Sequence, residues 1–262
     1  MEPEAILIDL DGVLYTGDTP VPGAREAIGY LEEHGYPYRV VSNTTRSSRP
    51  TIASRLASLG FAIPASFIFT PAMAAAAAMT AAGRTRAALL ATRDVAGELV
   101  AAGIQECDTG VQYVVVGDAG DRLTYASLNA AFRHLLRGAD LIALEKDRYW
   151  MGADGMMLSA GPFVTALEYA SGKTARVMGK PSPDFFALAL ASLGVQPGQA
   201  VMIGDDVVTD VGGAISCGLS GILVRTGKYG EDALRSARVA PTAILSSIAD
   251  LPEYLESGVP GT

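Results

Sequence analysis

The strongest constraint on the fold is a regular alternation of short apolar runs with longer segments of helical periodicity. The run Ala5–Asp9 is followed by a helical pattern over Ala24–Glu33 and by a second apolar run, Tyr38–Val41. Farther along the chain, Ala200–Ile203 and Gly221–Val224 continue the pattern. Such alternation predicts an α/β protein whose strands form a parallel sheet.

A second alternating stretch lies between these two blocks. It contains apolar runs predicted as strands at 87–91, 113–116 and 141–144, and helical patterns at 72–82, 95–101, 125–136 and 162–170. The stretch is far longer than one crossover connection requires. We therefore expect a Rossmann-like parallel-sheet core, formed by residues 1–72 and 176–262, with an α/β cap domain inserted at residues 73–175. The apolar run 175–178 is predicted to be the core strand that leads into Lys180.

The composition excludes several classes of protein. The chain is 49% hydrophobic and 18% charged, which is too apolar for an intrinsically disordered protein. No apolar run approaches the ~18 residues of a membrane helix. The formal net charge of −8 argues against a nucleic-acid partner, because nucleic-acid phosphates would be repelled.

The cysteine and histidine content argues against a zinc site. Cys107 and Cys217 form no CxxC pair, and His34 and His134 are the only histidines in the sequence. Two reduced thiols fit a cytosolic protein. The acidic first residues lack the basic start and long apolar core of a signal peptide. We therefore expect a cytoplasmic protein with no membrane partner.

Polar residues suited to phosphate chemistry follow several of the predicted core strands. The carboxyl ends of parallel strands share one edge of a sheet, and ligands bind at that edge. We therefore expect these residues to meet in one crevice, although they are far apart in the sequence. In chain order they are Asp9, Asp11, Gly12, Ser42, Asn43, Lys180, Asp205, Asp206 and Asp210.

This set of residues has a coherent chemistry. Asp9, Asp11 and Asp205 offer the hard oxygen ligands that Mg²⁺ prefers. The Asp9 carboxylate can attack phosphorus and form an aspartyl-phosphate. Asp11 can protonate the leaving oxygen and later activate water. Mg²⁺ and Lys180 would neutralise the charge of the phosphoryl group during these steps.

The remaining residues of the set are expected to bind phosphate or to support the ligands. Ser42, the backbone N–H of Asn43 and Gly12 are assigned to the other phosphoryl oxygens. Asp206 stays open between a weak ligand, a support for the ligands and a capping residue. Asp210 is expected to orient Lys180 or a metal-bound water and not to touch the metal.

Four ordered segments resemble the motifs of the haloacid dehalogenase superfamily: Asp9-Leu10-Asp11-Gly12-Val13, Ser42-Asn43, Gly179-Lys180-Pro181 and Gly204-Asp205-Asp206-Val207-Val208-Thr209-Asp210. The long insertion between the second and third motifs resembles the C2 cap of the subfamily that includes nucleotide, p-nitrophenyl phosphate and phosphoglycolate phosphatases. The resemblance implies that Asp9 is the nucleophile, Asp11 the acid/base and a backbone metal ligand, and Asp205 a metal ligand. It also implies a homodimer that pairs through the cap.

Further segments resemble one subgroup of these proteins, the phospholysine phosphohistidine inorganic pyrophosphate phosphatases and their relatives. The segments are 161–170, 179–186 and 225–229. Some members of this subgroup carry serine at the position of Asp11. The aspartate at this position here favours an ordinary phosphomonoesterase.

Two other groups of residues have competing interpretations. Lys146, Tyr149 and Trp150 follow a predicted cap strand and are candidates for reading the leaving group of the substrate. They fit equally well a packed aromatic pair beside a solvated lysine, and Trp150 alternatively fits a subunit interface. The segment Ser171–Thr174 looks like the end of a P-loop, but it lacks the upstream glycine and precedes a strand, so we reject that interpretation.

The sequence therefore predicts a Mg²⁺-dependent phosphatase that acts on a small phosphorylated metabolite. Two alternatives stay open: phosphoryl transfer to another acceptor, and a phosphate-ligand sensor that retains the fold. Binding alone would not require Asp11, which argues against the sensor. Dehalogenation needs no metal and leaves the acidic residues without a role. The substrate stays open among sugar phosphates, nucleotides, phosphoglycolate, pyridoxal phosphate and pyrophosphate.

Overall fold

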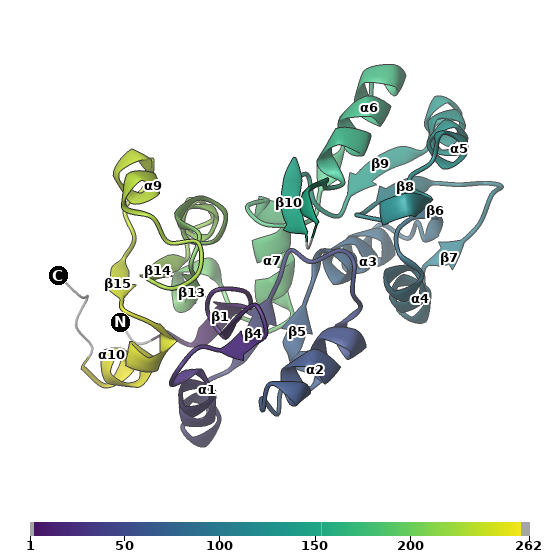
Figure 1. Cartoon of the computed structure of the whole chain (residues 1–262). Helices are drawn as coiled ribbons and strands as arrows, with labels where there is room; N and C mark the ends of the chain where they lie inside the picture. Colours follow the sequence, from purple (N-terminus) through teal and green to yellow (C-terminus); the bar gives the residue numbers. More distant parts are fainter. Residues whose placement is uncertain (1–2, 153, 258–262) are drawn as a thin grey trace. The chain divides into compact units, whose positions relative to one another are not determined.

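The computed structural model describes residues 3–152 and 154–257, and they form two compact units. Unit 1 consists of the residues up to Ser42, of Ile52–Phe69 and of the residues from Lys180 onward. Unit 2 consists of Asn43–Thr51 and Thr70–Gly179. Each unit is built around a parallel sheet with helices, as Figure 1 shows. The predicted α/β class is confirmed.

Unit 1 contains a six-stranded sheet in the order β15-β14-β13-β1-β4-β5, in which every neighbouring pair is parallel. A short antiparallel hairpin, β2–β3, follows β1. The strands are β1 (Ala5–Asp9), β2 (Tyr15–Thr16), β3 (Thr19–Pro20), β4 (Tyr38–Val41), β5 (Ile68–Phe69), β13 (Ala200–Gly204), β14 (Ser220–Val224) and β15 (Ala243–Leu245). The helices are α1 (Ala24–Glu33), α2 (Arg49–Ser58, whose first turn belongs to unit 2), α7 (Pro183–Ala191), α8 (Gly213–Ser216), α9 (Glu231–Ser236) and α10 (Leu251–Ser257).

The central strands of this sheet are buried on both faces, as is usual for a parallel sheet covered by helices. All five residues of β1 and of β13 are buried. One face packs against apolar side chains of α1, α2 and α10. On the other face, Leu223 packs with Val207 and Val211 of the turn after β13. The Phe69 and Phe185 rings meet edge to face, with 5.4 Å between their centroids.

Unit 2 contains a five-stranded parallel sheet in the order β12-β9-β8-β6-β7 and a separate antiparallel hairpin, β10–β11. The strands are β6 (Arg86–Leu90), β7 (Gln105–Glu106), β8 (Tyr113–Val116), β9 (Asp140–Ala143), β10 (Tyr149–Gly152), β11 (Gly155–Leu158) and β12 (Arg176–Val177). The helices are α3 (Pro71–Ala81), α4 (Arg93–Ala101), α5 (Tyr125–Leu136) and α6 (Gly161–Ser171). Helices α3 and α4 lie side by side, as do α5 and α6 (Figure 1).

Threonine caps start three of these helices. The side chains of Thr70, Thr92 and Thr124 each accept a hydrogen bond from a backbone N–H of the first turn of α3, α4 and α5. A capping side chain satisfies a donor that has no partner within the helix. Gly172 ends α6 in the left-handed region, at φ +70°. These local signals explain why the helices of unit 2 begin and end close to where the sequence predicts them.

Two placements differ from the sequence-based prediction. Strand β12 pairs with β9 and therefore belongs to the sheet of unit 2, whereas the run 175–178 was predicted to be a core strand. Residues 43–51, 70–72 and 176–179 also belong to unit 2, although the predicted boundaries place them in the core. Apolar periodicity identifies a strand, but it does not identify the sheet that the strand joins.

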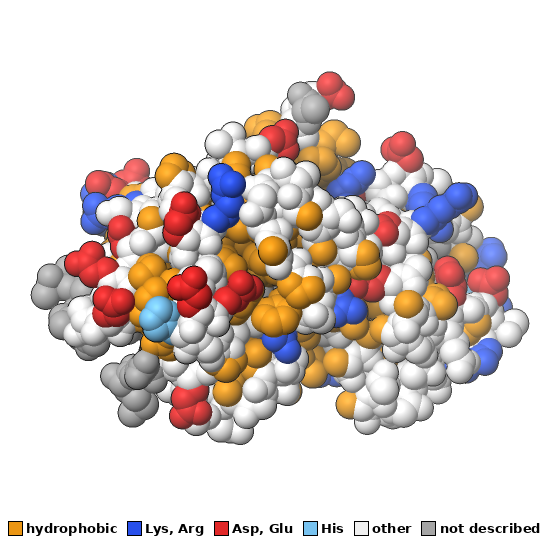
Figure 2. Space-filling view, turned by 90° about the horizontal axis from the view of Figure 1, so that it is seen from below, with side chains coloured by type: hydrophobic (Ala, Val, Ile, Leu, Met, Phe, Trp, Pro, Cys, Tyr) orange, Lys and Arg blue, Asp and Glu red, His pale blue; other side chains and the backbone are white. Residues whose placement is uncertain are grey.

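The surface carries charges of both signs. On the face shown in Figure 2, acidic and basic side chains are interspersed. Among residues 3–152 and 154–257, no helix combines the length and the hydropathy that a crossing of the bilayer requires.

Candidate active site

The carboxyl ends of the central strands of unit 1 bring the acidic residues together. Asp9 is the last residue of β1 and pairs with Val41 at the end of β4. Ser42 follows β4, and Asp205 follows β13, which pairs with β1. Because all these strands are parallel, the residues that follow them lie along one edge of the sheet.

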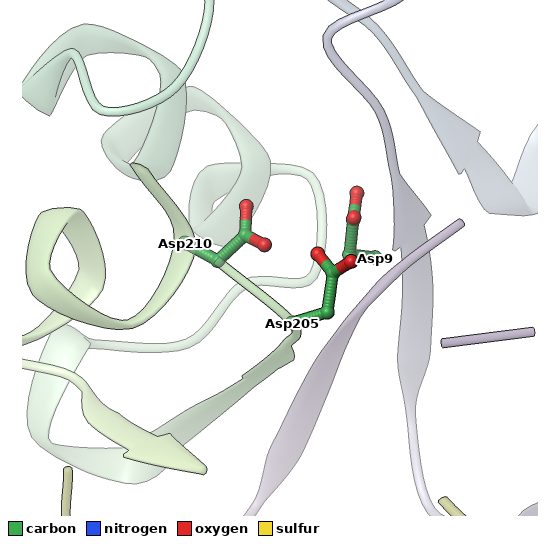
Figure 3. Close-up of side chains that lie close together, drawn as sticks. All are labelled: Asp9, Asp205 and Asp210. Atoms are coloured by element: carbon green, nitrogen blue, oxygen red, sulfur yellow. The ribbon is translucent and has the colours of Figure 1, made fainter. Parts of the chain in front are cut away.

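A buried lysine joins two of these carboxylates. Lys180 Nζ lies 2.5 Å from Asp9 Oδ1 and 2.7 Å from Asp210 Oδ1. Asp205 provides a third carboxylate, and oxygen atoms of Asp9, Asp205 and Asp210 all lie within 4.8 Å of one another. Figure 3 shows the three carboxylates approaching each other from the end of β1, the end of β13 and the π-helical turn Val207–Gly212.

The electrostatics of this cluster reflect burial and mutual repulsion. Burial, and the nearby Asp9 charge, raise the pKa of Asp210 to about 6. Burial also raises the pKa of Asp205 to about 6 and that of Asp9 above its ordinary value, although Lys180 opposes the rise at Asp9. Burial disfavours the charged form of Lys180, but Asp210 and Asp9 outweigh it and raise the pKa of the ammonium group. Lys180 is therefore charged at neutral pH.

The residues fit a divalent cation with a preference for oxygen ligands. Asp205 Oδ2 accepts a hydrogen bond from the backbone N–H of Lys228 at 2.7 Å. Its other oxygen, Oδ1, is buried and has no hydrogen-bond partner among the described residues. A buried carboxylate oxygen without a partner is costly unless a cation occupies the site. Carboxylate oxygens are the ligands that Mg²⁺ and Ca²⁺ take.

Asp11 lies just beyond β1, and its carboxylate is not part of the group of three carboxylates. The Tyr15 hydroxyl donates a hydrogen bond to Asp11 Oδ2 at 3.5 Å. Asp11 is in contact with solvent. Partial burial of its carboxyl group nevertheless raises the pKa of Asp11 above its ordinary value. A raised pKa favours the protonated form that a general acid needs.

Three more predicted residues lie in unit 1. Ser42 is buried, and its backbone N–H donates to the Phe69 carbonyl at 3.2 Å. Asp206 Oδ1 accepts hydrogen bonds from the backbone N–H groups of Val208, at 2.8 Å, and Thr209, at 3.0 Å. Of the three roles left open for Asp206, the structure shows capping. Gly12 has a φ of +82° and packs directly against Asp205.

Four predicted residues belong to unit 2. Asn43 is its first residue. Lys146 Nζ forms an ion pair with Glu168, at 2.7 Å from Oε2. Tyr149 and Trp150 are exposed on β10, and the Arg46 guanidinium lies 5.4 Å from the centroid of the Trp150 ring. The roles predicted for these four residues in binding phosphate or selecting substrate stay predictions.

The loop after β14 contacts the site, although none of its residues is among the predicted site residues. Thr226 Oγ1 donates a hydrogen bond to the Gly12 carbonyl, and Lys228 N binds Asp205. The available signal is the position of Thr226-Gly227-Lys228, just beyond a core strand at the same edge as Asp9 and Asp205. Nearly every residue has a backbone N–H, so the residue types in this loop do not predict its hydrogen bond to Asp205.

The known proteins that are similar to this chain belong to one family. Residues 6–105 match the family model described as haloacid dehalogenase-like hydrolase, and residues 177–251 match a model described as HAD-hydrolase-like. The chain is 45% identical over 226 residues to the human haloacid dehalogenase-like hydrolase domain-containing protein 2, covering 86% of this chain and 85% of that protein. It is 38% identical over 257 residues to the human phospholysine phosphohistidine inorganic pyrophosphate phosphatase, covering 95% and 93%.

A solved structure extends the similarity to a metal-bound protein. The crystal structure of a glycerol phosphate phosphatase from Mycobacterium tuberculosis in complex with magnesium is similar with a TM-score of 0.84 and 27% sequence identity. The similarity covers 97% of this chain and 78% of that one.

Proposed function

Because the chain belongs to the haloacid dehalogenase-like hydrolases, and is a phosphatase of that family, we propose that it hydrolyses a small phosphorylated metabolite through a covalent phosphate on Asp9. The observation that carries the proposal is the pairing of Lys180 with Asp9 at 2.5 Å, beside a buried Asp205 oxygen that has no partner among the described residues.

In the proposed first step, a carboxylate oxygen of Asp9 attacks phosphorus, and the bond from phosphorus to the leaving oxygen breaks. Asp11 gives its proton to that leaving oxygen, so that an alcohol departs. In the second step, water attacks the phosphorus of the aspartyl-phosphate while Asp11 takes a proton from it. The bond from phosphorus to Asp9 breaks, and inorganic phosphate leaves.

The other residues of the site offset the negative charge of the phosphoryl group and hold the reacting groups in position. The Lys180 ammonium offsets negative charge on the phosphoryl oxygens, and Asp210 holds Lys180 in place through their 2.7 Å ion pair. Asp9 and Asp205, with the Asp11 backbone implied by the family, would hold a divalent metal, which we propose to be Mg²⁺. A bound divalent ion supplies positive charge that lets two anions, the carboxylate and the phosphate, approach each other.

The proposal is tested by phosphate release from a panel of esters that includes p-nitrophenyl phosphate, glycerol phosphate, phosphoglycolate, a nucleotide, pyridoxal phosphate and pyrophosphate. We expect turnover with Mg²⁺ and loss of turnover with excess EDTA. Asp9→Asn is nearly isosteric but is a much weaker nucleophile, so kcat should fall by at least about 10³-fold. Full activity of Asp9→Asn would exclude the proposed intermediate. Addition of glycerol as an acceptor separates hydrolysis from phosphoryl transfer, because only transfer gives a new ester.

We also propose that two copies pair through unit 2. Large apolar side chains are exposed on the hairpin β10–β11, and an exposed apolar patch of this kind is typical of protein interfaces. The exposed apolar residues of the hairpin are Tyr149, Trp150, Met151, Met156, Met157 and Leu158. In light scattering coupled to size exclusion, we expect twice the chain mass of 27.1 kDa for the wild type. The double variant Trp150→Glu/Met157→Glu should give the monomer mass, and a monomeric wild type would contradict the proposal.

A further inference from the structure

The Asp205 carboxylate has two very different oxygens. Oδ2 accepts the 2.7 Å hydrogen bond from the backbone N–H of Lys228. Oδ1 is buried without a partner among the described residues. A single fixed donor on one oxygen orients the whole planar group, because rotation of the carboxylate would break that bond. The loop after β14 therefore decides which oxygen of Asp205 stays available as a ligand.

The same loop is tied to the chain that follows β1. Thr226 Oγ1 donates a hydrogen bond to the carbonyl of Gly12. The Gly12 N–H in turn donates to the Tyr15 carbonyl at 2.7 Å, which anchors Gly12 to the β2–β3 hairpin. Residues 226–228 thus hold Asp205 by a backbone donor and hold the residue next to Asp11 by a side-chain donor.

Two glycines make this close approach feasible. A Cβ on Gly227 would lie 2.9 Å from Asp205 Cγ, and a Cβ on Gly12 would lie 2.5 Å from the same atom and 2.9 Å from Gly227 Cα. Both glycines have positive φ, +82° at Gly12 and +60° at Gly227. Only glycine has neither a Cβ to collide nor a penalty for that backbone conformation.

We propose that the loop Thr226–Lys228 positions the divalent-cation site by holding Asp205 with Oδ1 as its free ligand atom and by fixing Gly12 beside it. This inference rests on the metal site of the proposed function. Residues that hydrogen-bond to metal ligands fix the orientation of those ligands, and their loss weakens metal affinity by about 10- to 100-fold. Thr226 and Gly227 are positioning residues, since each acts through Asp205 or Gly12.

The experiment measures the affinity of full-length protein for Mn²⁺ by electron paramagnetic resonance of the free ion, and for Mg²⁺ by calorimetry. Gly227→Ala should weaken both affinities by about 10- to 100-fold, because the added Cβ displaces Asp205. Thr226→Val, which is nearly isosteric, should weaken them by about 10-fold. Thr226→Ser keeps the donor and should restore affinity to within about threefold of the wild type. Far-UV circular dichroism in EDTA confirms that each variant is folded.

Wild-type affinity in Thr226→Val or in a folded Gly227→Ala would overturn the inference. If Gly227→Ala does not fold, the pair Thr226→Val and Thr226→Ser decides alone. Asp205→Asn separates this failure from failure of the proposed function. If the wild type binds no Mn²⁺, or if Asp205→Asn binds as the wild type does, the metal site itself is wrong and the inference falls with it. If Asp205→Asn loses binding but the loop variants do not, only the inference is wrong.

Discussion

Asp205 is a buried carboxylate whose charge lowers the stability of the folded protein and, in the proposed site, would favour a bound cation. Its folded-state pKa is raised to about 6 from an ordinary 3.8, chiefly by burial. The folded protein therefore holds a proton more tightly than the unfolded chain does. The stabilisation that protonation provides is present below pH 4 and is lost as the pH rises through 6.

This sign predicts the behaviour of Asp205→Asn in EDTA. At pH 7 the variant avoids a buried charge, so its free energy of unfolding should exceed that of the wild type by up to about 3 kcal/mol. The difference should shrink toward zero at pH 4, and the variant should gain no stability from Mg²⁺. Urea unfolding at both pH values, with and without Mg²⁺, measures these effects. A variant less stable than the wild type in EDTA at pH 7 would contradict the argument.

At the scale of elements, the segment 43–51 joins the carboxyl edge of the unit 2 sheet to α4. Thr45 Oγ1 accepts a hydrogen bond from Asp118 N, and Arg46 Nη1 binds Asp118 Oδ1, both at 3.0 Å. Ser48 N donates to Asp94 Oδ2 at 2.7 Å. The segment begins one residue after Ser42, so these bonds anchor the chain that leaves the predicted phosphate-binding residue.

The strongest of these anchors is the pair Arg49–Glu98. The Glu98 carboxylate is buried and accepts from Arg49 Nε at 2.5 Å and from Arg49 N at 3.1 Å. Glu98→Gln should lower the free energy of unfolding by about 1–3 kcal/mol, because it weakens charge-assisted bonds at a buried site. Arg235→Ala is the matched control, since its ion pairs with Glu231 and Asp232 are exposed and should contribute less than about 1 kcal/mol. Equal losses in urea unfolding would refute this distinction.

Elements with long apolar runs could be predicted from the sequence. Very short strands, and contacts made by backbone groups far apart in the sequence, could not. The strands at 5–9, 38–41 and 200–204 lie within one residue of their predicted positions, because buried parallel strands are mostly apolar. β5 and β15 were missed, since two or three residues give no period to detect. The rule that residues following parallel strands share one edge of a sheet correctly predicts that Asp9 and Asp205 lie close together. It does not account for Lys180, because the strand before it, β12, belongs to the sheet of unit 2. The loop 226–228 was not assigned a role, because its contact with Asp205 uses a backbone donor.

At the scale of the whole molecule, the chain passes between the two units four times. The hydrophobic core of unit 2 nevertheless comes from one continuous stretch of the sequence. All members of the main hydrophobic cluster of unit 2 lie between Leu90 and Ala175. The sheet β12-β9-β8-β6-β7 also lies entirely within residues 70–179. Unit 1 is different, since β1 needs β13 from the far end of the chain as a partner.

This asymmetry predicts the behaviour of fragments. The fragment 70–179 should fold alone and unfold cooperatively in urea, because it retains its sheet and core. The fragment 180–262 should remain unfolded, since β13 would lose its partner β1 on a sheet that is buried on both faces. Circular dichroism and dispersed amide resonances measure both outcomes. A disordered 70–179 fragment would contradict this prediction.

The pairing of β1 with β13 also sets the order in which the protein is completed on the ribosome. Ala5 pairs with Ala200, so the first strand waits for nearly two hundred residues to be made before its second neighbour arrives. At a synthesis rate of about 5–20 residues per second, that wait is roughly 10–40 s. Residues 70–179 emerge complete during this time. Asp9 meets Lys180 and Asp205 only after those two residues have been made, so the cluster of these side chains does not assemble before residue 205 has been translated.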